Sequence, residues 1–183
     1  GHKIYGPSGV GILYMKDKWL ENFNPYQGGG SMIKTVEIDK TSFAKGFQKY
    51  EAGTPPIAQV IGLGSSIKFV DKIGLENIFK YEKELHDYTV EKLSSDKDIF
   101  VYGKSPNKGA IISFNIKGIH ANDLAMFLDQ KNIAVRTGHH CCQPLMKYLN
   151  ITSTVRASFG IYNNLNDADL FTNSLIEAKK FFS

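Results

Sequence analysis

Two helical patterns that follow each other in the middle of the chain constrain its fold most strongly. Residues 57–73 and 75–93 both carry apolar side chains at the spacing of an amphipathic helix, in the second case among Glu and Lys. Short apolar segments typical of strands come next, at residues 99–102 and 110–116, and residues 121–130 again show a helical pattern. This succession predicts a fold that combines helices with short strands.

Further elements are expected toward both ends of the chain. Residues 10–15 and 133–136 have the apolar character of strands, and residues 154–163 read as a strand with an arginine inside it. A last helix is expected over residues 166–182, with Asn166 as its N-cap.

Thr54 and Pro55 stand just before the helix expected from residue 57. We expect Thr54 to be the N-cap and Pro55 to occupy the first helical position. Because the N-terminus of a helix also attracts anions, the same place suits a phosphate group as well as a simple cap.

Composition excludes several classes of function. The chain has 183 residues, 42% of them hydrophobic, which suits one large domain or two small ones. Its 22 basic and 18 acidic residues give a net charge of +4, but the lysines are scattered, so nucleic-acid binding is not indicated. No apolar run approaches the roughly 20 residues of a membrane span, and no leader opens the chain. We therefore expect a soluble protein.

The first residues, Gly1-His2-Lys3, lack an initiator methionine, so the chain looks cut. Its two cysteines are adjacent and offer no disulfide framework, which fits a reducing compartment such as the cytoplasm or an organelle matrix.

Both cysteines lie in one segment with two of the five histidines, Arg136-Thr137-Gly138-His139-His140-Cys141-Cys142-Gln143-Pro144. The thiolate is the reactive form of cysteine, and neighbouring cations such as Arg136, His139 and His140 favour it. Gly138 loosens the backbone and Pro144 ends regular structure, so Cys141 is expected on a loop, where a substrate could reach it.

Other interpretations of the two cysteines remain. Cysteine is often a small buried hydrophobe. A disulfide between Cys141 and Cys142 would be strained, because adjacent residues do not easily reach bridging geometry. A zinc site of His139, His140, Cys141 and Cys142 suits by composition, but zinc ligands are normally two to four residues apart.

The segment resembles the Arg-Thr-Gly-x-x-Cys-x-x-Pro active-site loop of cysteine desulfurases, specifically the SufS and selenocysteine lyase group (group II). These are enzymes of the class V aminotransferase superfamily that use pyridoxal 5'-phosphate (PLP) and have fold type I. The resemblance covers the whole chain. It implies an α/β fold made of the C-terminal part of the large PLP-binding domain, residues 1–85, and a small C-terminal α+β domain, residues 86–183, which carries the cysteine loop.

The start of the chain, Gly1 to Gly11, is similar to the family pattern Ser-Gly-His-Lys-x-Tyr-Gly-Pro-x-Gly-x-Gly. The resemblance implies that Lys3 holds PLP covalently, that His2 lies near the cofactor phosphate, and that Thr54 reaches the phosphate of the other subunit of a homodimer. A lysine serves this chemistry when its amine loses a proton. Gly28-Gly29-Gly30-Ser31-Met32 fits a family loop near the dimer interface, although by composition alone it suits a flexible linker.

For the reaction, the resemblance implies that Cys141 is the catalytic nucleophile. Arg156 is implied to bind the substrate carboxylate through its bidentate fork, and Arg136 to help orient the site. The implied activity removes sulfur from L-cysteine, giving L-alanine and an enzyme persulfide whose sulfur passes to an acceptor protein of the SufE or SufU type for iron–sulfur cluster assembly. Cys142 departs from the pattern, since alanine is common there.

Two alternatives stay open from the sequence. The substrate could be L-selenocysteine, which would make the protein a selenocysteine lyase. The family's segments that stack on the PLP ring and hold most of its phosphate precede the lysine motif and are absent here. The chain could therefore also be a non-catalytic dimerisation and partner-docking fragment.

Overall fold

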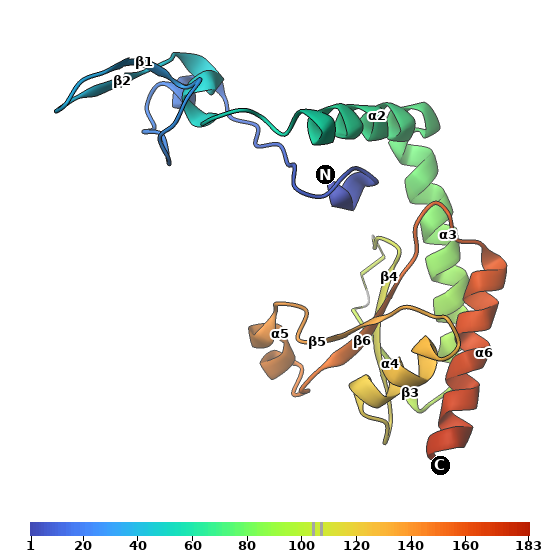
Figure 1. The fold of residues 1–183 in the computed structure, drawn as a ribbon. Coiled ribbons are helices and arrows are strands. Elements are labelled where there is room, and N and C mark those ends of the chain that lie inside the picture. The colour runs from blue at the N-terminus through green and yellow to red at the C-terminus, as the bar shows by residue number, and fades with distance from the viewer. Residues whose placement is uncertain (104, 107) are drawn as a thin grey trace. The chain divides into compact units, whose positions relative to one another are not determined.

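The computed structural model describes residues 1–103, 105–106 and 108–183. It divides into two compact units, Gly1–Gly74 and Leu75–Ser183, which are described separately (Figure 1). The family's domain boundary near residue 85 stays a prediction.

The first unit consists of short elements followed by one long helix. The 3₁₀ helix η1 (His2–Ile4) and the helix α1 (Asp17–Leu20) come first, and β1 (Ile33–Val36) then pairs antiparallel with β2 (Thr41–Phe43). The 3₁₀ helix η2 (Gly46–Tyr50) leads to α2 (Ile57–Ile73), which confirms the helix predicted there.

The strand predicted at residues 10–15 is wrong. This segment pairs with no strand among the described residues, and its side chains Ile12, Leu13 and Tyr14 are 77%, 83% and 81% exposed. Apolar β-forming residues become a strand only where a neighbouring strand takes up their backbone hydrogen bonds.

The glycine-rich segment is a packed turn. Met32 is fully buried, and the Gly30 carbonyl accepts a hydrogen bond of 2.8 Å from the Gly53 amide. A Cβ at Gly29 would come within 3.1 Å of the Ala52 Cβ. These contacts contradict the flexible-linker interpretation.

The N-cap predicted for α2 is also wrong. Pro56 occupies that position, and no side chain caps the helix. A residue before proline is disfavoured in the helical region, so Pro56 keeps Pro55 out of the helix and moves its start past both prolines. Thr54 is exposed and lies outside α2.

The second unit is a four-stranded antiparallel sheet with helices. Its elements are α3 (Leu75–Ser94), β3 (Ile99–Tyr102), β4 (Ile111–Ile116), α4 (Ala121–Asp129), β5 (Arg136–Gly138), α5 (Gln143–Tyr148), β6 (Thr154–Ser158) and α6 (Leu165–Phe182). The strand order is β3-β4-β6-β5, so β6 pairs with β4 on one side and with β5 on the other. The predicted helices and strands of this region are confirmed, although β5 starts three residues later than expected and β6 is shorter.

The core of the second unit lies between one face of the sheet and the helices α3, α4 and α6 (Figure 1). Ile112 and Phe114 of β4 and Val155 of β6 are fully buried in it, and Phe114 packs edge-on against Phe171 of α6 with ring centroids 5.6 Å apart. Because side chains alternate along a strand, Ser113, Thr154 and Arg156 belong to the opposite face.

Helix α6 begins one residue earlier than predicted and is capped by Asn164, not by Asn166. The Asn164 side chain accepts hydrogen bonds from the amides of Asn166 and Asp167, and the Asp167 carboxylate accepts one from the Asn164 amide. This capping box explains the shift, because it satisfies more of the free amides than a cap at Asn166 would. Among the residues that the structure describes, no helix is long and apolar enough to cross a membrane.

Candidate active site

The cysteine loop leaves the edge strand β5 through a tight left-handed turn. Gly138 has φ 109°, and His140 and Cys141 follow with φ 52° and 59°. The Cys142 amide donates a hydrogen bond of 2.9 Å to the His139 carbonyl and closes the turn. For residues other than glycine, this left-handed conformation costs about 1–2 kcal/mol each. Other contacts must therefore hold the loop in place. The predicted placement of Cys141 on a loop is confirmed.

An arginine lies beside the exposed sulfur of Cys141. The Arg136 Nη2 donates a hydrogen bond to the Cys141 Sγ at 3.6 Å. The Cys141 sulfur is thus both exposed and in contact with a cationic side chain.

A second arginine stands opposite the first. Arg136 of β5 and Arg156 of β6 are register partners, and side chains of residues directly opposite in an antiparallel pair share one face of the sheet. Like charges so placed repel each other, so this pair is suited to an anion that both can contact.

Arg156 has an unsatisfied donor. Its Nε atom is buried and has no hydrogen-bond partner among the described residues. A buried N–H without an acceptor is costly, and a carboxylate would satisfy it with the bidentate geometry that guanidinium favours. The arrangement therefore suits a substrate that carries a carboxylate.

The sequence predicted His140 as a cation beside Cys141, but it did not reveal that its ring contacts Thr154. The His140 Nε2 lies 3.1 Å from the Thr154 carbonyl oxygen and 2.9 Å from the Thr154 Oγ1. Burial lowers the pKa of His140 below its ordinary value, and the charges of Arg156, Arg136 and His139 act in the same direction. The position of Thr154 could have been predicted from strand alternation, because Thr154 lies two residues before Arg156 and so shares its face of the sheet.

Lys3 belongs to the first unit and lies in the 3₁₀ helix η1. The segment after it packs closely on α2, because a Cβ at Gly6 would come within 3.1 Å of the Leu63 Cδ1 and one at Gly62 within 2.7 Å of the Pro7 Cγ. These two glycines allow the close approach.

The residues of the lysine motif fit a cofactor with a reactive aldehyde and a phosphate. Lys3 is exposed, and its amine has no hydrogen-bond or ion-pair partner in the described part of the chain. A free primary amine is what PLP requires for its covalent attachment. The exposed His2 imidazole and Thr54 hydroxyl are both able to donate hydrogen bonds to a phosphate.

The two units divide the predicted residues. Arg136, Cys141 and Arg156 come together in the second unit, whereas His2, Lys3 and Thr54 are in the first. The catalytic and binding roles predicted for all six residues stay predictions.

The chemistry of the cysteine pair does not point to a metal. Cys141 and Cys142 are both free thiols. Within the described ranges, no group of three or more His, Cys, Asp or Glu side chains is arranged to hold a metal ion.

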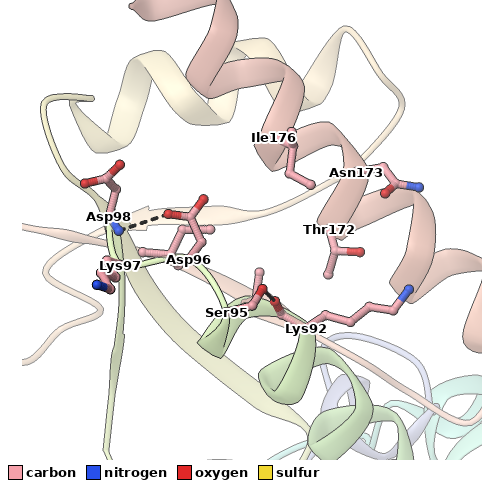
Figure 2. A pocket seen from close by; sticks show the side chains of 10 residues that line it. Lys92, Ser95, Asp96, Lys97, Asp98, Thr172, Asn173 and Ile176 are labelled. Atoms are coloured by element: carbon pink, nitrogen blue, oxygen red, sulfur yellow. Dashed lines mark hydrogen bonds between the residues drawn. The ribbon is translucent and has the colours of Figure 1, made fainter.

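The second unit also contains a cavity of about 580 Å³ between the end of α3, the start of β3 and α6. Figure 2 shows Asp96 and Asp98 on one side of it and Thr172, Asn173 and Ile176 of α6 on another. No residue of the cysteine loop lines this cavity, so it is not part of the site around Cys141.

Protein relatives match the whole chain. A "Probable cysteine desulfurase" of Staphylococcus aureus (strain COL) is 45% identical over 184 residues, which cover 100% of this chain and 45% of the relative. The "Cysteine desulfurase" of Wigglesworthia glossinidia brevipalpis is 44% identical over 182 residues, covering 99% of this chain and 44% of that protein. The chain thus spans less than half the length of these relatives.

Solved structures also match nearly the whole chain. The crystal structure of the cysteine desulfurase CsdA (S-sulfonic acid) from Escherichia coli superposes with a TM-score of 0.94 at 32% identity, over 100% of this chain and 45% of that one. The apo cysteine desulfurase from Thermococcus onnurineus NA1 gives a TM-score of 0.92 at 37% identity, over 97% of this chain and 44% of that one. The predicted α/β fold, part of PLP-dependent fold type I, is thereby confirmed.

The family profile "Aminotransferase class-V" matches residues 1–171. With helices, sheet and motif order all in agreement, this chain belongs to the aminotransferase class-V family.

Proposed function

We propose that this chain carries the sulfur-transfer part of a PLP-dependent cysteine desulfurase, which converts L-cysteine to L-alanine and leaves the sulfur as a persulfide on Cys141. The observation that carries the proposal is the group of Arg136, Cys141 and Arg156 on one side of the sheet. It offers a nucleophilic sulfur on the loop that follows β5 and a carboxylate anchor on the neighbouring strand β6. Relatives named as cysteine desulfurases support it.

Each residue has a defined task in the proposed reaction. Arg156 binds the carboxylate of L-cysteine, and the Lys3 amine takes the proton from its Cα. In the resting enzyme Lys3 would hold PLP, with His2 and Thr54 at its phosphate. The Lys3 amine would be released when the substrate binds, and PLP would supply the electron sink for this chemistry.

Sulfur transfer follows at Cys141. The Cys141 thiolate, next to Arg136, attacks the substrate sulfur, and the bond between that sulfur and Cβ breaks. The electron pair of that bond goes to Cβ, which takes a proton, and Cα regains the proton held by the Lys3 amine. Alanine then leaves, and the persulfide remains on Cys141.

The finer parts of the proposal concern the protein's partners. We place it in the SufS group, as a homodimer in the cytoplasm or an organelle matrix. It would pass its sulfur to an acceptor of the SufE or SufU type for iron–sulfur cluster assembly. The proposed domain assignment is residues 1–85 to the large PLP-binding domain and residues 86–183 to the small domain.

The test is alanine release from L-cysteine by the purified protein supplied with PLP. We expect Cys141→Ser to abolish both alanine release and the persulfide, and Lys3→Ala to abolish the visible absorbance of the bound cofactor. Full alanine release by Cys141→Ser would contradict the role of Cys141. L-Selenocysteine in the same assay tests the lyase alternative, and absence of turnover with either substrate would favour a docking fragment.

A further inference from the structure

The His140 side chain joins the cysteine loop to the neighbouring strand. Its Nε2 lies within hydrogen-bond distance of both the carbonyl oxygen and the Oγ1 of Thr154, a residue that is 1% exposed. Gly138 and Thr154 are the last register pair of β5 and β6, so this contact continues the strand pairing into the loop. It is the place where the left-handed turn is attached to the sheet.

These contacts define the tautomer of His140. A carbonyl oxygen only accepts hydrogen bonds, so the proton must be on Nε2. The Nδ1 atom is buried without a partner among the described residues, and protonating it would leave a buried donor unsatisfied. The charged and titratable groups that act on this ring, Arg136 and Arg156 of the two strands and His139 of the loop, also disfavour a second proton.

Cys141 has few other means of keeping its position. It follows His140 directly and is exposed. Among the residues that the structure describes, its sulfur is held only by the 3.6 Å hydrogen bond from Arg136. Because both residues adopt left-handed backbone conformations that side chains disfavour, a loop released from Thr154 would relax and carry the sulfur away from Arg136.

We propose that His140 is a positioning residue, which acts by anchoring the loop to Thr154 so that the Cys141 sulfur stays beside Arg136. The effect of His140 on turnover rests on the proposed function. Its anchoring of the loop depends on neither the cofactor nor the substrate. His140 neither donates nor removes a proton in the reaction.

The test measures the alkylation rates of Cys141 and Cys142 by iodoacetamide at neutral pH, with peptide mass spectrometry to separate the two sites. His140→Asn keeps a residue type that tolerates left-handed backbone but is too short to reach Thr154. We expect it to slow Cys141 about tenfold, as loss of a buried hydrogen bond would, and to leave Cys142 unchanged. His140→Gln places an amide donor near the Nε2 position and should restore most of the rate.

A double-mutant cycle with Arg136→Gln distinguishes positioning from general destabilisation. If His140 acts through Arg136, then His140→Asn adds no further loss of Cys141 reactivity once Arg136 is replaced. His120→Asn is the matched control. His120 is an exposed histidine that caps α4 through the Asn122 amide, and its replacement should leave Cys141 reactivity unchanged.

Additive losses in the cycle, or an unchanged Cys141 rate in His140→Asn, would overturn the proposal. In the active enzyme we expect His140→Asn to lower kcat about tenfold with little change in KM for L-cysteine, because Arg156 remains in place. Alkylation needs neither PLP nor turnover. If His140 and Arg136 are coupled in the alkylation cycle but the protein has no desulfurase activity, the anchoring role of His140 is upheld and only the proposed function is refuted.

Discussion

Arg136 and Arg156 face each other across the β5–β6 pair, with the Cys141 sulfur 3.6 Å from the first guanidinium. The Nε of Arg156 is buried and has no partner in the described part of the chain. Two like charges on opposite positions of a sheet lower stability unless an anion lies between them. The arrangement therefore suits a bound anion, as the carboxylate-binding role proposed for Arg156 requires.

Replacing Arg156 by lysine tests the carboxylate anchor. Lysine keeps the positive charge but loses the planar fork, so Arg156→Lys should lower kcat/KM for L-cysteine roughly 10- to 100-fold. Steady-state alanine release measures this effect. Lys117→Ala, which removes an exposed cation elsewhere in the second unit, should leave kcat/KM unchanged. An equal loss of kcat/KM in Arg156→Lys and Lys117→Ala would contradict the role of the planar guanidinium fork in binding the carboxylate.

Cys142 is expected to be dispensable. It is half-buried at the start of α5, and its side chain does not cap that helix. Cys142→Ser should change alanine release by less than about twofold, because substitutions away from packed contacts have small effects. Mass spectrometry of the protein after one turnover should locate the extra sulfur on Cys141. Sulfur found on Cys142 would assign it a role as a second acceptor.

The lowered pKa of His140 predicts a pH-dependent stability. Because burial lowers the pKa of His140 in the folded state, the unfolded chain binds a proton there more readily. Stability from this residue is thus complete above the ordinary histidine pKa of about 6.5 and is lost as the pH falls below it. Urea unfolding at several pH values should show this loss in the wild type. In His140→Gln, which has no titrating group at this position, the loss should be smaller.

A second pH effect is expected at the edge of the cavity in Figure 2. Lys179 contacts Asp96 at 2.7 Å and Asp98 at 2.8 Å, and its hydrogen bond lowers the pKa of Asp96 below the ordinary value. Stability from this carboxylate is present above the unfolded pKa and is lost as the pH falls through the folded one. Asp96→Asn should therefore unfold at lower urea concentration than the wild type at neutral pH, with the difference closing in acid. Asp129→Asn, on an exposed residue of α4, should show no such trend.

The capping box of α6 gives a prediction about stability alone. Asn164→Ala removes the side chain that caps two amides, and should cost about 1 kcal/mol, or roughly 2–4 °C in Tm. Asn166→Ala is the matched control and should have little effect, because the Asn166 amide donates to the cap while its side chain is exposed. A larger loss in Asn166→Ala would contradict the observed cap.

The sequence by itself determined the elements whose signals are local. The apolar periodicity correctly predicted the positions of helices α2, α3, α4 and α6 and of strands β3 and β4. A regular apolar spacing indicates the secondary structure that places those side chains on one face. The position of Cys141 on a loop also followed from its glycine and proline neighbours. The motif order was enough to predict the family.

Only the tertiary structure decided features that depend on contacts between distant residues. The segment 10–15 has the composition of a strand but pairs with none among the described residues. Asn164 instead of Asn166 caps α6 because Asp167 completes the box. The opposition of Arg136 and Arg156, and the contact of His140 with Thr154, arise from the register of β5 on β6, which residues far apart in the sequence set jointly.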